Sequence, residues 1–110
     1  MTSVTLFTDE NDKYYGFTAS GHAGYAAAGN DIVCAAVSVL LINMTNSVDE
    51  LLKKEYSFSE DEKKGCMEFK VNDYADSNVQ LLFESLNLGL KEIAREYPKN
   101  LKLTNRRCRP

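Results

Sequence analysis

The sequence has 110 residues, is 44% hydrophobic and carries a formal net charge of −3, which fits one globular domain over residues 1–110 whose core needs neither disulfides nor a structural metal. Its three cysteines, Cys34, Cys66 and Cys108, have no CxxC spacing and stand beside a single histidine, which argues against a disulfide framework and a zinc site, so we expect no metal and no cofactor. No stretch contains the roughly 18 consecutive apolar residues that a membrane-spanning helix requires, and the first residues lack the pattern of a secretory signal peptide. We therefore expect a cytoplasmic protein that makes no contact with a membrane and keeps its thiols reduced.

The chain begins with two segments of alternating hydrophobicity. Residues 3–8, SVTLFT, and residues 14–20, YYGFTAS, place apolar side chains at every second position, which is the period of a β-strand with one buried face. The polar segment DENDK between them, at residues 9–13, is typical of a turn. Together these features predict a β-hairpin.

From Asn30 onward the hydrophobic spacing changes to three and four residues, which is typical of a helix buried along one side. Asn30 and Asp31 are residue types that cap helix N-termini, so we expect this long helix to begin there. The apolar positions that carry the prediction are Val33, Val37, Leu40, Leu41, Met44, Val48, Leu51 and Leu52.

A second hairpin and a second helix follow. Residues 55–60 and 66–71 are predicted strands, because the segment DEKKG between them suits a tight exposed turn. The second helix is predicted to start near Ala75 or Asp76 and to end near Glu96, because a proline follows at position 98. Its apolar stripe comprises Val79, Leu82, Phe83, Leu86, Leu90, Ile93 and Tyr97.

The last segment is expected to add one more strand at residues 101–104, LKLT, and then a basic tail at residues 104–110 with Arg106, Arg107 and Arg109. For this tail we expect a flexible, solvated end, with contact to an acidic partner such as RNA as the alternative. The order strand, strand, helix, strand, strand, helix, with a last strand, predicts an α+β fold. It would be a two-layer sandwich in which two long helices cover a largely antiparallel sheet.

The single histidine, His22, and Cys34 stand at the two ends of a loop rich in Gly and Ala. His22 follows the second predicted strand and Cys34 lies in the first turns of the predicted helix, so a chain reversal between them can bring the two side chains together. The positive end of a helix dipole favours a thiolate, and an imidazole can accept the thiol proton and later protonate a leaving amine. Free N–H groups at the helix start, including that of Cys34, could stabilise an oxyanion.

Each of these residues also has an ordinary structural interpretation. A cysteine inside IVCAAVSVLL can simply pack against the sheet, and a histidine at a strand end can be a turn residue. Asp31 either orients His22 or complements the helix dipole. Ser38, one helical turn after Cys34, either donates to the site or bonds back to its own helix.

The loop between the second strand and the helix is expected to take part in the site. Gly21, Gly24 and Gly29 would give its backbone freedom up to Asn30, and Tyr25 would offer an aromatic surface to a substrate side chain. A short loop with this composition is also what a lid over a site requires.

The stretch GHAGYAAAGNDIVCAAVS, residues 21–38, resembles the signature of the Prp family of ribosomal-processing cysteine proteases from Firmicutes and related bacteria. The resemblance implies an endopeptidase that removes the N-terminal extension of large-subunit ribosomal protein twenty-seven, with Cys34 as nucleophile and His22 as general base. It also implies a homodimer with its active site under a mobile loop. The matching residues are Gly21, His22, Gly24, Tyr25, Gly29, Asp31, Val33, Cys34, Ala35, Ala36 and Ser38.

Two other classes of function stay open on the residues alone. A non-catalytic ribosome-associated module would bind a ribosomal protein or ribosomal RNA through the loop and the arginines, and would keep that affinity after Cys34→Ala. A redox-sensing thiol would respond to oxidation at Cys34 and would not need His22. Only a protease would lose cleavage and keep binding in that variant.

Overall fold

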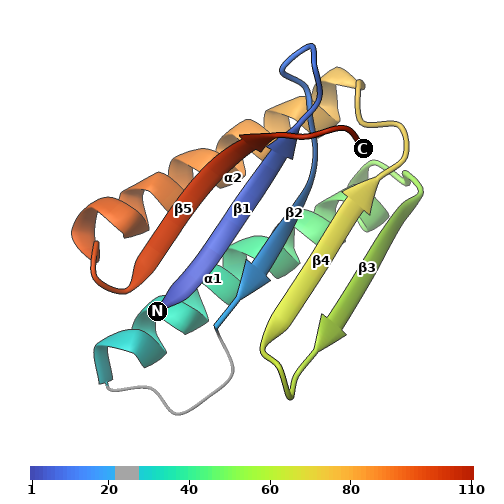
Figure 1. Cartoon of the computed structure of the whole chain (residues 1–110). Helices are drawn as coiled ribbons and strands as arrows, with labels where there is room; N and C mark the ends of the chain where they lie inside the picture. Colours follow the sequence, from blue (N-terminus) through green and yellow to red (C-terminus); the bar gives the residue numbers. More distant parts are fainter. Residues whose placement is uncertain (22–27) are drawn as a thin grey trace.

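The computed structural model describes residues 1–21 and 28–110. Two hairpins alternate with two long helices and a last strand completes the order, so the predicted α+β class is confirmed (Figure 1). The elements are β1 (Thr2–Thr8), β2 (Tyr14–Ser20), α1 (Ala28–Asn46), the π-helical turn η1 (Ser47–Leu51), β3 (Tyr56–Asp61), β4 (Cys66–Val71), α2 (Ser77–Glu96) and β5 (Leu101–Arg107).

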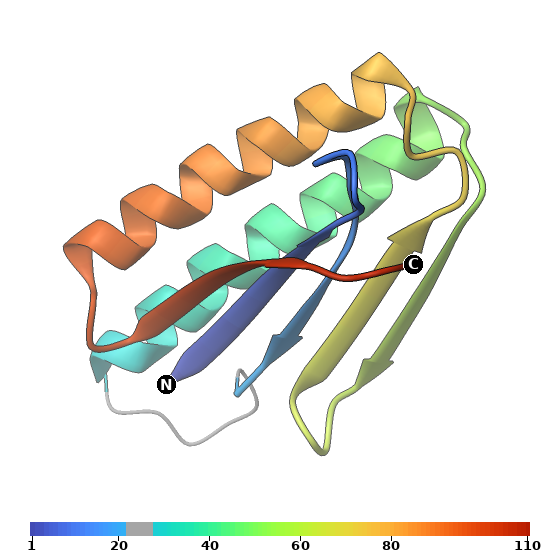
Figure 2. The same cartoon turned by 45° about the horizontal axis from the view of Figure 1, so that its top comes forward.

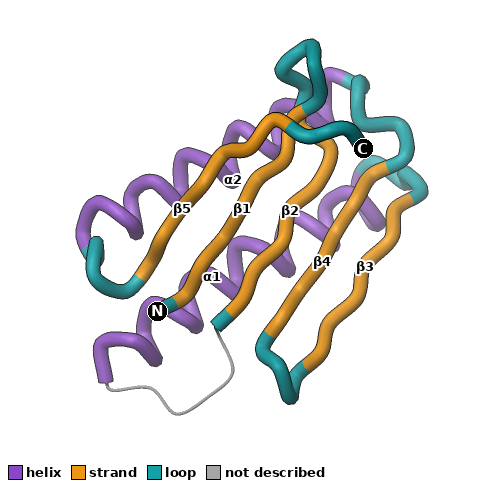
Figure 3. The backbone as a smooth tube through the Cα atoms, in the orientation of Figure 1, coloured by secondary structure: helices purple, strands orange, loops and turns teal. Residues whose placement is uncertain are grey.

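The five strands form one mixed sheet in the order β3-β4-β2-β1-β5. Neighbouring strands are antiparallel except β1 and β5, which run parallel with Thr2 beside Leu101 and Thr8 beside Arg107. Both helices pack on the same face of this sheet, and none of the described helices covers the other face (Figures 2 and 3). The two layers expected from the sequence are therefore present.

The alternating positions of the strands and the stripes of the helices meet in a hydrophobic core between the two layers. Val4, Leu6 and Phe17 of the first hairpin are fully buried, and the rings of Phe17 and Phe69 stack with centroids 5.0 Å apart. Removal of this apolar surface from water is the main stabilising contribution to the fold. The core comprises Val4, Leu6, Phe17, Ala19, Val33, Val37, Leu41, Met44, Val48, Met67, Phe69, Val71, Val79, Phe83, Leu86, Leu90 and Leu101.

Helix α1 differs from the prediction at both ends. It begins at Ala28, two residues before the expected cap at Asn30, because alanine has the highest helix propensity and extends the helix ahead of its polar cap candidates. Asn30 and Asp31 therefore lie inside the first turn, and the predicted cap position is wrong. At the other end Leu51 is 76% exposed rather than buried, because the wider π-helical turn η1 changes the angular spacing of its side chains.

Judged by length and composition alone, the segment Ile32–Leu51 is long and apolar enough to cross a membrane, since its mean hydropathy is 1.6. The stretch is still not a continuous apolar run, because Ser38, Asn43 and Thr45 interrupt it, and it meets the criterion only through its average composition. In the structure, 39% of this stretch is buried, and Val33, Val37 and Leu41 face the sheet as part of the core. This is the position of a core helix, a class of helix that passes the same test in soluble proteins.

Helix α2 follows the prediction closely. Asp76 precedes its first residue and accepts hydrogen bonds from the N–H groups of Asn78 at 2.8 Å and Val79 at 3.3 Å, which caps the helix. These two N–H donors, with Lys54 at 3.5 Å, hold the pKa of Asp76 below its ordinary value. Tyr97 was expected on the buried stripe but is exposed, because the helix ends one residue before it.

Strand β5 extends to Arg107, so the tail predicted to begin at residue 104 begins only after the strand. The strand is this long because it pairs with β1 over its whole length. One further hydrogen bond follows after the end of β5, from the Cys108 N–H to the Thr8 carbonyl oxygen at 2.9 Å. The Arg107 guanidinium also forms an ion pair with Asp12 in the β1–β2 turn. Two of the three C-terminal arginines, Arg106 and Arg107, are thus part of the folded sheet.

Asp9 connects the β1–β2 turn to the loop before α2. Its carboxylate accepts hydrogen bonds from the N–H groups of Asn11 at 2.8 Å and Lys13 at 3.0 Å and from the Tyr74 hydroxyl at 2.8 Å. The Lys13 N–H has the largest effect, and together these donors hold the pKa of Asp9 below its ordinary value against the opposing effect of burial. The ionised form of Asp9 is therefore the one that stabilises the fold.

We expect Asp9→Asn to lower the free energy of unfolding at pH 7. In the unfolded chain the pKa of an aspartate is about 3.9. The contribution of Asp9 to the free energy of unfolding is therefore fully present above that pH, and it is lost as the pH falls through the lower pKa of the folded state. Urea unfolding at pH 7 and at about pH 3 should show a difference between wild type and variant that shrinks at the lower pH. Asp49→Asn, in η1, is the matched control, and a difference for Asp9→Asn that stays constant with pH would contradict the assignment.

Candidate active site

Cys34 lies in the second turn of α1, seven residues into the helix counted from Ala28. Its side chain is half-buried and carries a free thiol. The sulfur lies 3.5 Å from the hydroxyl oxygen of Thr2, a distance that fits a hydrogen bond to sulfur in which either atom can be the donor. The candidate nucleophile is thus held at the boundary between the helix and the first strand of the sheet.

Thr2 is the residue of this site that the sequence did not indicate. It is the first residue of β1, and its side chain is only 3% exposed. Its N–H donates to the Asn100 carbonyl oxygen at 2.9 Å, and Leu101 lies beside it on β5. Thr2 and Cys34 are 32 positions apart in different elements, so no local pattern could have paired them.

Gly21 follows the last residue of β2 and has a φ of +84°, in the left-handed region that favours glycine. A side chain would not fit here, because a Cβ on Gly21 would lie 2.3 Å from the carbonyl oxygen of Met1. The end of β2 is therefore packed directly on the start of β1, next to Thr2.

Several predicted site residues fall outside the part of the chain whose side chains are described. His22, Gly24 and Tyr25 lie outside the described residues altogether, and so the distance between His22 and Cys34 stays a prediction. Gly29, Asn30 and Asp31 belong to the first turn of α1 by their backbone. The site roles predicted from the sequence for Gly29, Asn30 and Asp31 stay hypotheses.

The helix start at Ala28 changes one expectation about the oxyanion. Because the first four N–H groups of a helix lack intrahelical partners, the free donors belong to residues 28–31, one turn before Cys34. The N–H of Cys34 itself lies in the regular hydrogen-bonded part of the helix, so the prediction that this N–H is free to bind an oxyanion is wrong.

Ser38 lies one helical turn after Cys34 and is half-buried. It lines a shallow groove together with Ile42 and Asn46.

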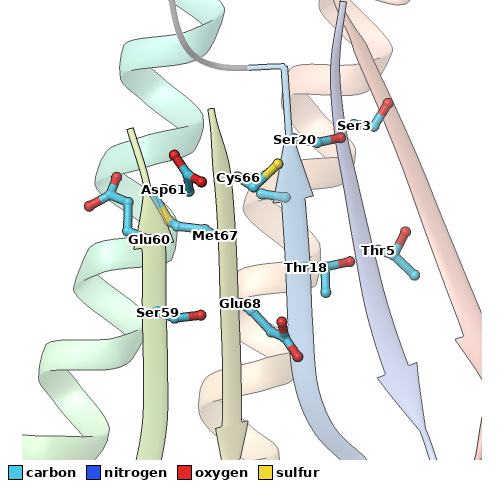
Figure 4. Close-up of a pocket in the computed structure, with 11 residues that line it drawn as sticks. Ser3, Thr5, Thr18, Ser20, Ser59, Glu60, Asp61, Cys66, Met67 and Glu68 are labelled. Atoms are coloured by element: carbon cyan, nitrogen blue, oxygen red, sulfur yellow. The ribbon is translucent and has the colours of Figure 1, made fainter. Parts of the chain in front are cut away.

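A groove of about 430 Å³ lies on the open face of the sheet, across β1, β2, β4 and β3. Figure 4 shows Ser20, Cys66 and Asp61 along one end of it, on three different strands. Cys34 belongs to the helix layer on the other face, so this groove does not contain the candidate nucleophile. The lining residues are Ser3, Thr5, Thr18, Ala19, Ser20, Ser59, Glu60, Asp61, Cys66, Met67 and Glu68.

A metal ion requires a group of acidic, cysteine or histidine side chains around it. Among the described side chains, at residues 1–21 and 32–110, no group of three or more His, Cys, Asp or Glu is placed to hold a metal ion. The chemistry suggested by the described geometry is that of a thiol at the edge of a helix and sheet contact, with a hydroxyl beside it.

Comparison with known families decides the class of this site. The model of the family described as cysteine protease Prp matches residues 1–102, which include both Cys34 and the loop before it. The chain belongs to this family. It is a ribosomal processing cysteine protease of the Prp type, so the class implied by the resemblance of residues 21–38 is confirmed.

Relatives in other bacteria cover nearly the whole chain. The ribosomal processing cysteine protease Prp of Bacillus subtilis is 30% identical over 108 residues, which cover 94% of this chain and 96% of the relative. The protein of the same name from Staphylococcus aureus is 26% identical over 103 residues, with coverage of 94% and 97%. These similarities extend well beyond the short signature stretch.

Solved structures show the same fold. The Streptococcus mutans protein SMU.848 is 30% identical with a TM-score of 0.90, and the match covers 98% of this chain and 99% of that one. The Staphylococcus aureus protease Prp in complex with a substrate peptide also has a TM-score of 0.90, at 24% identity and with coverage of 96% and 100%. The architecture of the Prp chain described above is thus that of its relatives.

Gly21→Ala should damage both the fold and the site of this Prp protease. A side chain is strained at a φ of +84° and meets the Met1 carbonyl oxygen at 2.3 Å, so we expect a loss of about 1–3 kcal/mol in the free energy of unfolding. Cleavage activity should fall further than the loss of folded protein explains, because the start of β1 must shift. Calorimetry and a peptide-cleavage assay measure the two effects.

Gly89→Ala in α2 is the matched control. A Cβ there would lie 3.0 Å from the end of the Leu40 side chain, which can move, and alanine favours the helix by about 0.5–1 kcal/mol over glycine. We expect this variant to keep the stability and activity of the wild type. A Gly21→Ala protein as stable as Gly89→Ala would contradict the packing described at the end of β2.

Proposed function

We propose that this chain is a cytoplasmic cysteine endopeptidase that removes the N-terminal extension of large-subunit ribosomal protein twenty-seven. The observation that carries the proposal is the family match over residues 1–102, together with the signature stretch at residues 21–38. The partner is then the N-terminal peptide of that ribosomal protein. The structures of the Staphylococcus aureus relative with a substrate peptide and with a covalently linked product peptide support a peptide as the ligand.

In the proposed mechanism Cys34 is the nucleophile and His22 the general base. His22 takes the thiol proton, and the sulfur forms a bond to the scissile carbonyl carbon. The carbon–nitrogen bond then breaks as His22 returns the proton to the leaving amine, and water hydrolyses the resulting thioester. The free N–H groups of the first turn of α1 stabilise the oxyanion, and Asp31 either orients the His22 ring or complements the helix dipole.

The placement of Cys34 supports this role for it. Cys34 is in the second turn of α1, adjacent to the first turn, in which the positive end of the helix dipole acts. Its side chain is partly exposed, in contrast to the flanking core residues Val33 and Val37, which are buried. A thiolate nucleophile needs this partial exposure in order to reach a substrate.

Cys34→Ala and His22→Ala should each abolish cleavage of the extended ribosomal protein while leaving its binding intact. Loss of either member of a catalytic pair lowers kcat by about a thousandfold or more. Cys66→Ala is the matched control, since Cys66 is also half-buried and free. Mass spectrometry of both fragments, with binding measured separately, gives the result.

The wild type should make a single cut near the N-terminus of the substrate, and Cys66→Ala should cut equally fast. If the wild type binds without cutting, the non-catalytic binding module becomes the better account. If Cys34→Ala still cuts, the assignment of the nucleophile is wrong.

We also propose that the protein forms a homodimer, as the family resemblance implies, through the outward face of α1. The helix carries no charged residue from Ile32 to its end at Asn46, and Ile32 and Val39 are 61% and 67% exposed. A helix that is hydrophobic all round is normally covered on every side. An uncharged face also suits a second copy of the same chain, because a two-fold interface brings each residue near its own equivalent and like charges would repel.

Val39→Glu should then weaken the dimer, because a two-fold contact places two new carboxylates close together. Leu81→Glu is the matched control, since Leu81 is 63% exposed on α2. Sedimentation equilibrium over a range of protein concentrations should show a dimer for the wild type and for Leu81→Glu, and a shift towards monomer for Val39→Glu. A monomeric wild type, or an equal effect of both substitutions, would contradict the proposal.

A further inference from the structure

We propose that Thr2 is a positioning residue for Cys34, and that the Thr2 hydroxyl donates a hydrogen bond to the Cys34 thiolate. The inference rests on the proposed role of Cys34 as nucleophile. The contact is the 3.5 Å distance between Thr2 Oγ1 and Cys34 Sγ. While the thiol keeps its proton, either atom can donate. Once the thiol is ionised, only the hydroxyl has a proton to give, so the contact favours the reactive form of the cysteine.

The Thr2 hydroxyl is a well-fixed donor. The side chain is 3% exposed, and a β-branched residue has few accessible rotamers. Its backbone is held in place by the hydrogen bond from the Thr2 N–H to the Asn100 carbonyl oxygen and by the strand pairing with Leu101. A donor that is already fixed before ionisation needs little reorganisation when charge develops on the sulfur.

The same strand start also contacts the other side of the site. Met1 precedes Thr2, and its carbonyl oxygen lies against Gly21, where a Cβ would come within 2.3 Å. Gly21 precedes His22 in the chain. Met1 and Thr2, at the start of the first strand, thus contact both Gly21 and the sulfur of Cys34.

Thr2→Val tests the hydroxyl with little change in shape, and Thr2→Ser restores it. The readout is the rate of iodoacetamide alkylation of Cys34 at pH 7, resolved residue by residue by mass spectrometry. Cys66 and Cys108 are free in the same protein and serve as internal standards. Thr5→Val is the matched control, since Thr5 lies on the same strand but lines the open-face groove.

A hydrogen bond to a charged group is worth more than one between neutral groups, so we expect alkylation of Cys34 to slow by about three- to tenfold in Thr2→Val. Thr2→Ser and Thr5→Val should stay within about twofold of wild type. The rates at Cys66 and Cys108 should not change in any variant. In peptide cleavage, Thr2→Val should lower kcat by a similar factor and leave KM unchanged.

Two results would overturn the proposal. Equal or faster alkylation in Thr2→Val would mean that the thiol donates to Thr2 rather than the reverse. Equally slow alkylation in Thr2→Ser would mean that the methyl group of Thr2 acts by packing alone. Because alkylation needs no substrate, these outcomes are independent of the cleavage assay with Cys34→Ala, which tests the proposed function itself.

Discussion

The packing of α1 across the sheet is the interaction on which the rest of the site depends. Val33 and Val37 are buried on the core side of the helix, and they fix its rotation about its own axis. Since Cys34 follows Val33 directly, that rotation places the sulfur at the border of the buried face. There it meets Thr2 of β1 and remains partly exposed, as a reactive thiol must.

Most of the fold could be predicted from periodicity alone. The two hairpins and the body of both helices follow from alternation and from three- and four-residue spacing, because these patterns are local. The pairing of β5 with β1 is different, because it joins Thr2 to Leu101 across almost the whole chain. The arginines at residues 106 and 107 suggested a solvated end, and only the parallel neighbour strand explains why they are in the sheet.

The site was predictable only in part, and the reason is again the range of the interactions. Cys34 and the loop before it lie in one continuous stretch whose pattern carries a family signature. Thr2 carries no such signal, because an isolated threonine at a strand start is common and its partner lies in another element. The helix start was also placed two residues late, since the propensity of Ala28 prevailed over the cap signals at Asn30 and Asp31.

One helix therefore serves both stability and chemistry, and the two are coupled through neighbouring residues. A substitution at Val33 or Val37 would open a cavity in the core and would also turn or shift the sulfur of Cys34. Thr2 differs from these positions, because it contacts the sulfur of Cys34 through its hydroxyl oxygen. At Thr2 the hydroxyl can be removed while the shape of the side chain is retained. A substitution there can therefore change the reactivity of the thiol without changing folding, whereas a substitution in the buried face of α1 changes both.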